Sequence, residues 1–248
     1  MKALILAAGY ATRLWPLTKN KPKPLLEVKD KPIIDHIIGH FKEIPEITEV
    51  FVVTNEKFSL AFEQWAESVN FGIPIKIIND MTTSNEDRLG AVGDMKYVID
   101  EVKLDDDLLV IAGDNLFEYK LSDFYAYFKK KKSSIVACKD MVSLDEVKEK
   151  FGVVELNNSN KITGFEEKPL NPKSAVAATA CYIFAKEDVR SIKNYIEAGN
   201  KPDNAGDFIK WLSNHKPVFA FVFTEKWFDI GSFESLGKAR EEFDDKPL

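Results

Sequence analysis

Residues 1–18, MKALILAAGYATRLWPLT, combine an apolar run with residue types that could bind a phosphate group. The run Ala3–Ala8 leads directly into Gly9, and Arg13 follows. Glycine lets a chain pass close to a ligand, and successive backbone N–H groups in such a turn form a concave site for anions. The planar guanidinium of arginine matches a pair of phosphate oxygens. An ordinary turn after a strand could contain the same residues, so both interpretations stay open.

Two common phosphate-binding motifs are absent from this stretch. No G-K-[ST] follows the glycine, as a P-loop requires, and Ala11 stands where a dinucleotide-binding G-x-G-x-x-G motif needs its second glycine. Downstream, Lys23 lies between Pro22 and Pro24. Two prolines stiffen the backbone and could present the lysine at a fixed place beside a phosphate, although a solvated basic loop would have the same composition.

Two aspartates follow apolar segments and are candidate ligands for Mg²⁺. Asp114 comes just after the run 108–112, and Asp229 precedes Ser232, a residue type that caps helices. Mg²⁺ prefers one or two carboxylates together with phosphate oxygens and water. Asp114 could equally be an ordinary turn residue, and the two form one metal site only if the fold brings them together.

The pattern of apolar residues predicts the elements that position these groups. Short runs rich in valine and isoleucine predict buried strands at 3–7, 49–54, 75–78, 108–112 and 134–138. Apolar residues at three- and four-residue steps predict helices over 33–44 and 58–69. Strands that alternate with helices indicate a largely parallel sheet, whose ligands lie beyond the carboxyl ends of its strands.

The second half of the chain has a different rhythm. We expect strands at 150–157 and 161–169 joined by the turn 157–160, a longer strand at 176–184, and another over 217–231. Helices are expected at 186–198, 206–214 and 232–243. The sequence contains no internal repeat and no low-complexity linker, so one domain is predicted.

Composition excludes several classes of function. The net charge of −6 and the pI near 5.3 argue against a surface that binds nucleic acid. No segment approaches the ~20 apolar residues of a membrane span. Cys138 and Cys181 match no metal-binding spacing and are interpreted as reduced core residues. The expectation is a cytoplasmic protein without a nucleic-acid or membrane partner.

Taken together, seven motifs in order resemble the sugar-1-phosphate nucleotidylyltransferase family, which contains glucose-1-phosphate thymidylyl-, uridylyl- and cytidylyltransferases and mannose-1-phosphate guanylyltransferases. The motifs are LAAGYATRLWPLT, KPKPLLEVKDKPII, RLGAVGD, GDN, FGVVE, FEEKP and WFDIGSFESL. The resemblance implies a Rossmann-like α/β fold with a mixed, mostly parallel sheet and helices on both faces. It implies a single nucleotidyltransferase domain over 1–248, with 1–140 mainly binding nucleotide and 141–248 mainly binding sugar phosphate.

The resemblance also implies a role for each matching residue. The nucleotide would be bound by Leu6, Ala8, Gly9, Thr12, Arg13, Lys23, Gly90 and Asp114, with Gly90 against the base. The sugar phosphate would be bound by Asn115, Gly152, Glu167 and Lys168. Asp114 and Asp229 would hold Mg²⁺, and Arg13, Lys23 and Lys168 would be the catalytic residues.

The implied reaction converts an NTP and a hexose 1-phosphate into an NDP-sugar and pyrophosphate by Mg²⁺-dependent in-line displacement. A phosphate monoester has its second pKa near ~6, so this nucleophile needs no general base at pH 7. UTP or dTTP is expected ahead of CTP and GTP, while the sugar stays open. Two alternatives are a non-catalytic regulator that binds sugar nucleotides and a cytidylyltransferase that acts on a non-sugar phosphate.

The chain departs from the family pattern in two places. Most relatives carry glycine where this chain has Ala11, so we expect a slightly more restricted loop. The segments that usually build the interfaces of the family are abbreviated after the last motif. The oligomeric state therefore stays open between a monomer and a homo-oligomer.

Overall fold

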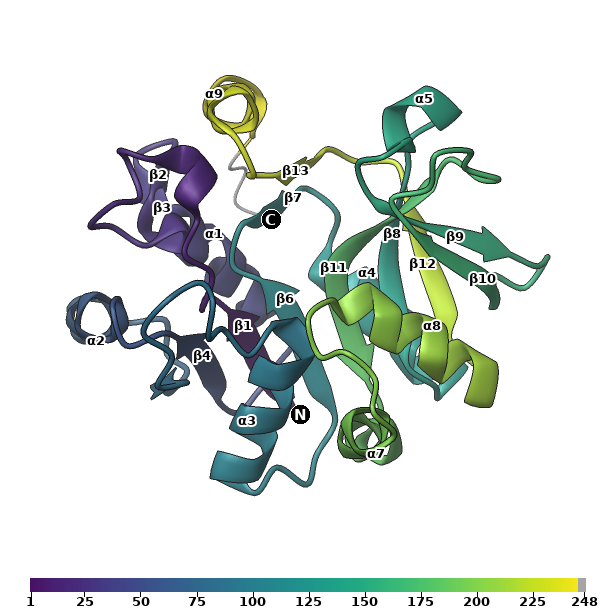
Figure 1. Ribbon diagram of the computed structural model, residues 1–248, viewed down its shortest axis with the longest axis horizontal. Helices are drawn as coiled ribbons and strands as arrows, with labels where there is room; N and C mark the ends of the chain where they lie inside the picture. Colours follow the sequence, from purple (N-terminus) through teal and green to yellow (C-terminus); the bar gives the residue numbers. More distant parts are fainter. Residues whose placement is uncertain (245–248) are drawn as a thin grey trace.

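A nine-stranded sheet forms the centre of the protein (Figure 1). The structure is a computed structural model that describes residues 1–244, so the last four residues of the predicted domain lie outside the described part. The central strands run in the order β10-β9-β11-β6-β1-β4-β5, while β8 pairs with β11 and β12 pairs with β8. Their bounds are β1 Lys2–Leu6, β4 Val50–Thr54, β5 Ile75–Asn79, β6 Leu108–Ala112, β8 Ile135–Asp140, β9 Gly152–Leu156, β10 Ile162–Glu167, β11 Val176–Phe184 and β12 Phe219–Phe223.

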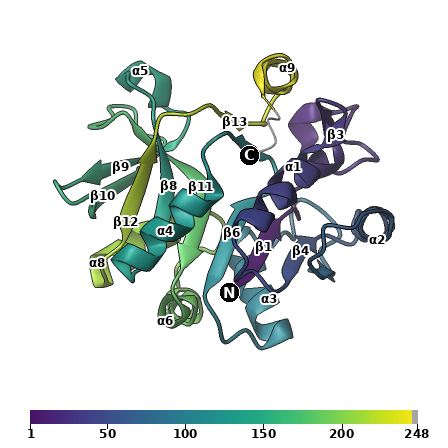
Figure 2. The same ribbon diagram turned by 180° about the vertical axis from the view of Figure 1, so that it is seen from behind.

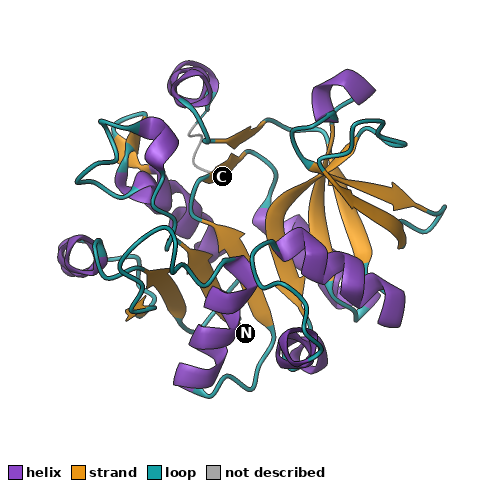
Figure 3. Cartoon of the chain, viewed as in Figure 1, coloured by secondary structure: helices purple, strands orange, loops and turns teal. Residues whose placement is uncertain are grey.

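Helices lie on either side of this sheet (Figure 3). Their bounds are α1 Ile33–Gly39, α2 Ser59–Ser68, α3 Ala91–Val102, α4 Leu121–Lys131, α5 Leu144–Val147, α6 Lys186–Val189, α7 Ser191–Glu197, α8 Ala205–His215 and α9 Phe233–Glu242. Short 3₁₀ turns cover Thr12–Leu14, Lys23–Leu25 and His40–Glu43. Small strand pairs form between β2 Glu27–Val28 and β3 Lys31–Pro32, and between β7 Asn115–Phe117 and β13 Trp227–Asp229.

The two faces of the sheet are covered by different helices, as the alternation of residues along a strand requires. In β1, Ala3 and Ile5 pack into an apolar cluster with α1, α2 and α4, whereas Leu4 packs into a second cluster with α3 and α8. Figure 1 views the face covered by α3, α7 and α8, and Figure 2 shows α1 and α4 on the opposite face. The predicted fold class is confirmed.

Strands β6, β1, β4 and β5 form the parallel part of the sheet, and the rest is mostly antiparallel, with β12 parallel to β8. Strand β11 is antiparallel to β6, β8 and β9. The predicted hairpin between 150–157 and 161–169 is the antiparallel pair β9–β10. This change of strand direction follows the change of rhythm in the sequence after residue 140.

Three predicted elements are shorter than expected because they break at particular residues. The predicted strand 217–231 is two strands, β12 and β13, that belong to different sheets and are separated by the exposed polar residues 224–226. The predicted helix 33–44 ends as an α-helix at Gly39 and continues as a 3₁₀ turn. The predicted helix 186–198 is divided into α6 and α7.

Two further predictions concern the core and the membrane. Cys138 and Cys181 are buried in the core as free thiols. Within residues 1–244, no helix has both the length and the apolar character that crossing a lipid bilayer requires.

Candidate active site

A cleft of about 450 Å³ lies beyond the carboxyl ends of β1 and β6. From β1 the chain continues to β4 and β5 on one side, and it later returns to β6 on the other side of β1. The strand order therefore reverses between β1 and β6, which is where open α/β sheets bind their ligands. The opposite wall of the cleft comes from the β9–β10 hairpin, β11, the start of α8 and β13.

The cleft brings the predicted site residues together from distant parts of the chain. Its walls include Leu6, Ala8, Gly9, Arg13, Lys23, Gly90, Asp114, Asn115, Gly152, Glu167, Lys168 and Asp229. Among the described residues predicted for the site, Thr12 alone is not part of these walls, because its exposed side chain begins the 3₁₀ turn that carries Arg13. The individual roles of these residues stay predictions.

The loop after β1 is held in place by two buried polar side chains. Asn55 donates a hydrogen bond from Nδ2 to the carbonyl oxygen of Ala8 at 2.8 Å, and Thr18 donates from Oγ1 to the carbonyl oxygen of Ala11 at 2.7 Å. Ala11 adopts the left-handed conformation, with φ 47° and ψ 40°. Gly9 does not have a positive φ, and a Cβ built on it meets no described atom within 4 Å. Gly9 therefore does not use the backbone angles that glycine alone adopts freely, whereas Ala11 adopts a left-handed conformation.

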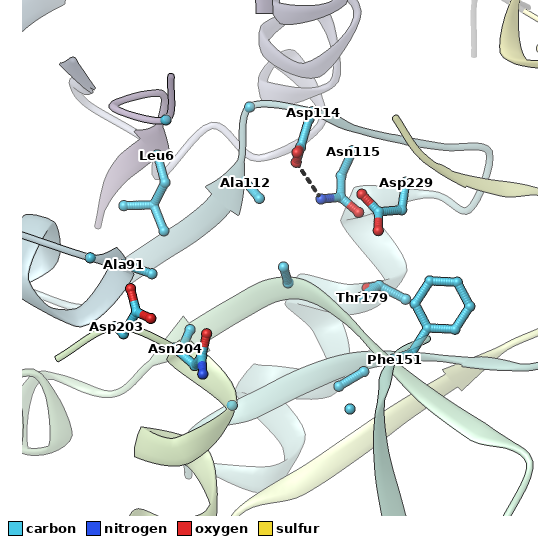
Figure 4. A pocket seen from close by; sticks show the side chains of 18 of the residues that line it. Leu6, Ala91, Ala112, Asp114, Asn115, Phe151, Thr179, Asp203, Asn204 and Asp229 are labelled. Carbon is cyan, nitrogen blue, oxygen red and sulfur yellow. Dashed lines mark hydrogen bonds between the residues drawn. The ribbon is translucent and has the colours of Figure 1, made fainter. Parts of the chain in front are cut away.

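Asp114 and Asp229 lie at one end of the cleft because β7 and β13 pair. Asp229 is opposite Asn115 in this antiparallel pair, and the backbone N–H of Ile230 donates to the carbonyl oxygen of Asp114 at 3.0 Å. Figure 4 shows the two aspartate side chains in the same part of the cleft. The fold thus fulfils the condition that the sequence left open for a shared metal site.

Three cations surround this pair of carboxylates. Lys23 Nζ lies 2.8 Å from Asp114 Oδ2. The Asp229 side chain opens to the cleft, but the surrounding protein partly desolvates its carboxyl and, together with Asp114, raises its pKa to about 6. The positive charges of Lys23, Arg13 and Lys168 oppose this rise, so all three act on the same carboxyl. Asp229 is therefore mostly ionised at pH 7.

The donor set at this end fits Mg²⁺ bound together with a ligand. Within residues 1–244, no group of three or more histidine, cysteine or acidic side chains could hold a metal ion. Asp114 and Asp229 supply carboxylates from two strands, and Mg²⁺ commonly takes one or two carboxylates and completes its shell with phosphate oxygens and water. An ion at this position would thus depend on a phosphate ligand.

Asn115 supports Asp114 from behind. Its Oδ1 accepts a hydrogen bond from Trp227 Nε1 at 2.6 Å, and its Nδ2 donates to Asp114 Oδ1 at 3.1 Å (Figure 4). The Trp227 ring also packs against Phe151, with the ring centroids 4.9 Å apart. Asn115 was predicted to bind sugar phosphate, and its side-chain contacts give it a structural task in orienting Asp114.

The predicted sugar-binding residues gather on the opposite wall. A Cβ on Gly152 would lie 2.5 Å from Phe165 Cζ and 3.0 Å from Glu167 Oε2, and a Cβ on Gly206 would lie 2.6 Å and 2.9 Å from the same two atoms. Only glycine fits at these two positions while Phe165 and Glu167 stay in place. Partial burial raises the pKa of Glu167, and the neighbouring charge of Lys168 opposes that rise.

The far end of the cleft, at the start of α3, is closed by the loop before α8. Arg88 pairs with Asp203, with Nη2 and Oδ1 3.2 Å apart, and the backbone N–H of Ala91 donates to the carbonyl oxygen of Asp203 at 2.9 Å. Gly90 has φ 79°, and a Cβ on it would lie 2.5 Å from Asp203 Cα. The close approach of this loop is a structural reason for Gly90, and its contact with a base stays a prediction.

Several wall residues were missed by sequence reasoning. They include Arg88, Asp94, Phe151, Thr179, Asp203, Asn204, Gly206 and Trp227. Thr179 lies where the register between β11 and β8 shifts, and the loop of Asp203 meets α3 only in the folded chain. No local pattern signals such long-range contacts, whereas Arg88, Asp94, Phe151 and Trp227 stand inside motifs that were recognised.

Comparisons with known proteins agree with this geometry. A family model described as Nucleotidyl transferase matches residues 2–246. The bifunctional protein GlmU of Methanocaldococcus jannaschii is 30% identical over 233 residues, which make up 93% of this chain and 51% of that protein. This chain thus spans about half the length of that relative.

Solved structures share the fold over nearly the whole chain. A protein assigned as a glucose-1-phosphate thymidylyltransferase of Bacillus anthracis, in complex with a sucrose, has a TM-score of 0.83 at 25% identity and covers 100% of this chain and 97% of its own. A UDP-glucose pyrophosphorylase complexed with UDP-glucose has a TM-score of 0.81 at 22% identity, over 98% of this chain and 97% of its own, and shows likeness of fold alone. The chain belongs to the nucleotidyl transferase family, as the motifs in its sequence predict.

Proposed function

We propose that this chain transfers a nucleotidyl group from an NTP to a sugar 1-phosphate and releases pyrophosphate. The observation that carries the proposal is the convergence of two aspartates and three cations at one end of a single cleft. The name of the Bacillus anthracis protein, a glucose-1-phosphate thymidylyltransferase, supports the sugar-phosphate class.

The mechanism follows from the repulsion between two anionic substrates. The phosphate of a sugar 1-phosphate is mostly ionised at pH 7, so it can attack the α-phosphorus of the NTP without a general base. The protein has to bring the two anions into line and neutralise charge on the departing pyrophosphate. Arg13 and Lys23, on the wall beside the loop after β1, would contact the triphosphate, and Lys168, on the opposite wall, would contact the sugar phosphate.

Asp114 and Asp229 would hold Mg²⁺, which supplies charge neutralisation on the phosphate oxygens when it is bound. Lys23 contacts Asp114, and Asn115 orients the same carboxylate from the other side. These contacts fix the direction of the Asp114 oxygens before any substrate arrives. Preorganised charge of this kind is expected to contribute more to the rate than flexible surface charges would.

The proposed nucleotide is UTP or dTTP, and the proposed sugar is a hexose. The base preference is supported by the name of the Bacillus anthracis protein, a glucose-1-phosphate thymidylyltransferase. The sugar proposal is supported by Gly152 and Gly206, which leave room for Glu167 to face the cleft.

Pyrophosphate release tests the proposal. The purified chain is incubated with Mg²⁺ and each of UTP, dTTP, CTP, GTP and ATP, in combination with common hexose 1-phosphates and with phosphocholine. Release that requires both an NTP and a hexose 1-phosphate is expected. Tight binding of sugar nucleotides without turnover would instead indicate a regulator, and release with phosphocholine alone would indicate a non-sugar acceptor.

A further inference from the structure

A second pair of aspartates, Asp80 and Asp94, lies by the first turn of α3. Asp94 is 7% exposed and forms part of the cleft wall, and Asp80 is 4% exposed and follows β5. In Figure 4, Ala91 of the same helical turn lies at the opposite end of the cleft from Asp229. This second pair is therefore separate from the carboxylates proposed for Mg²⁺.

Asp80 is fixed on one side by its own loop. Its Oδ1 accepts hydrogen bonds from the backbone N–H of Thr82 at 2.8 Å and from Thr82 Oγ1 at 2.7 Å. Asp80 Oδ2 and Asp94 Oδ1 are both buried, and neither oxygen has a donor within residues 1–244. The two carboxyl groups are within hydrogen-bonding reach of each other. A single proton held between them satisfies both of these oxygens.

Burial and the charge of Asp80 raise the pKa of Asp94 to about 8, so Asp94 carries this proton at neutral pH. When its hydroxyl donates to Asp80, its other oxygen is left as a hydrogen-bond acceptor. Among the described side chains, only that of Asp80 forms a hydrogen bond with Asp94. The free acceptor is thus available on the cleft wall.

The surroundings of this acceptor suit a planar ring. Leu6 and Ala91 present aliphatic side chains at this end of the cleft (Figure 4). Gly90, which precedes Ala91, also lines the cleft and has no side chain. An NTP whose phosphates lie near Arg13 and Lys23 would extend its base away from Asp229 and toward α3. Once a ring covers this oxygen, leaving it without a donor would be costly, so the ring that enters is expected to supply an N–H donor.

We propose that the Asp94 carboxyl, oriented by Asp80, accepts a hydrogen bond from a ring N–H of the nucleobase and thereby contributes to the choice of NTP. This inference rests on the proposed function. Uracil, thymine and guanine carry a ring N–H that can donate, whereas the corresponding ring nitrogen of cytosine or adenine is an acceptor. Asp94 therefore favours the first group and disfavours CTP and ATP.

Two substitutions at one position separate this role from a purely structural one. Asp94→Asn keeps a carbonyl acceptor and gives Asp80 an amide N–H, whereas Asp94→Leu has a similar branched shape and no acceptor. Equilibrium binding of UTP and CTP is measured for both variants, with Asp100→Asn on the exposed face of α3 as the matched control. We expect the UTP preference of the wild type to be kept in Asp94→Asn and in the control, and to fall roughly tenfold in Asp94→Leu.

A modified nucleotide tests the same hydrogen bond without changing the protein. N3-methyl-UTP lacks the ring donor, so the wild type is expected to bind it at least tenfold more weakly than UTP, and Asp94→Leu is expected to bind it about as weakly as it binds UTP. Equal binding of UTP and N3-methyl-UTP by the wild type would overturn the inference while leaving the proposed function standing. Failure of the wild type to bind any NTP would overturn both.

Discussion

The cleft holds two pairs of aspartates in opposite electrostatic surroundings. Asp114 and Asp229 lie beside Lys23, Arg13 and Lys168, and the pKa of Asp229 is raised only to about 6. Asp94 lies beside another carboxylate, Asp80, and burial together with this negative charge raises the pKa of Asp94 to about 8. The Asp114–Asp229 pair opens to the cleft whereas the Asp80–Asp94 pair is buried, and the two pairs are surrounded by different charges.

The difference shows that an aspartate pair balanced by neighbouring cations and one balanced by a proton suit different ligands. Cations around Asp114 and Asp229 keep the carboxylates charged and able to bind a metal ion or orient a phosphate. A proton on Asp94 removes its charge and leaves a hydrogen-bond acceptor, which suits an uncharged ring. One cleft can therefore bind the charged and the uncharged parts of one nucleotide at its two ends.

The largest effect is expected at the charged pair. Asp229→Asn removes a carboxylate and keeps its shape, so Mg²⁺-dependent turnover is expected to fall roughly 10³-fold, equivalent to several kcal/mol of transition-state stabilisation. The measurement is pyrophosphate release at saturating substrates, with circular dichroism to show that the fold is retained. Turnover within twofold of the wild type would remove Asp229 from the proposed metal site.

The next largest effect separates the cations around that pair. Lys168→Ala is expected to raise KM for the sugar 1-phosphate roughly 10- to 100-fold, because a hydrogen bond to a charged group contributes ~1.5–3 kcal/mol. In the same variant, KM for the NTP should change less than about threefold, because Lys168 is proposed to contact the sugar phosphate and not the NTP. Lys173→Ala, at a nearby exposed lysine, is the control. Equal losses for both substrates would show that Lys168 does not discriminate between them.

The protonated pair makes stability depend on pH. The pKa of Asp94 is raised from 3.8 to about 8 in the folded state, so its stabilising effect is fully present below about pH 4 and is lost as the pH rises toward 8. Asp94→Asn removes this titration. Between pH 5 and pH 7 the wild type should lose roughly 2 kcal/mol of unfolding free energy relative to the variant, measured by urea denaturation. A difference that is independent of pH would contradict a shared proton.

The smallest effect is expected at Ala11, in the loop that carries Arg13. Ala11 has a left-handed conformation, which costs a residue with a Cβ ~1–2 kcal/mol. Glycine avoids this cost, but its larger loss of backbone entropy on folding offsets ~0.5–1 kcal/mol of the benefit. Ala11→Gly should therefore stabilise the protein by about 0.5–1 kcal/mol. Ala198→Gly, at φ −74°, should give no gain. Destabilisation by Ala11→Gly in urea would show that the loop is not strained.

The sequence was most informative where local pattern and motif coincide. The runs that became β1, β4 and β6 were predictable because strands buried on both faces are apolar throughout, and β5, at the sheet edge, was predictable from its isoleucines although Lys76 is exposed. The cleft residues of the charged pair were predictable because they stand in motifs at the ends of strands. Asp229 was expected in one long strand over 217–231, but it lies in the short strand β13, because residues 224–226 divide the expected strand into two.

The other end of the cleft could not be predicted for a physical reason. Asp80 and Asp94 are separated in sequence by a loop, and neither the contact between them nor the burial that protonates Asp94 leaves a local pattern. The loop before α8 meets the first turn of α3 through Asp203, far along the chain from Gly90. Ala11 was identified as unusual, but its left-handed conformation emerged only with the backbone.

The central claim is that one aspartate pair is neutralised by cations and the other by a proton. Carbon-13 NMR of the aspartate carboxyl groups, recorded from pH 4 to pH 9 with and without Mg²⁺ and assigned with Asp229→Asn and Asp94→Asn, tests it directly. Asp94 is expected to titrate near pH 8 with a pKa that does not change when Mg²⁺ is added. Asp229 is expected to titrate near pH 6, and added Mg²⁺ should lower its pKa. Titration of Asp94 near its ordinary value of 3.8, or a response to Mg²⁺ at Asp94 and not at Asp229, would contradict it.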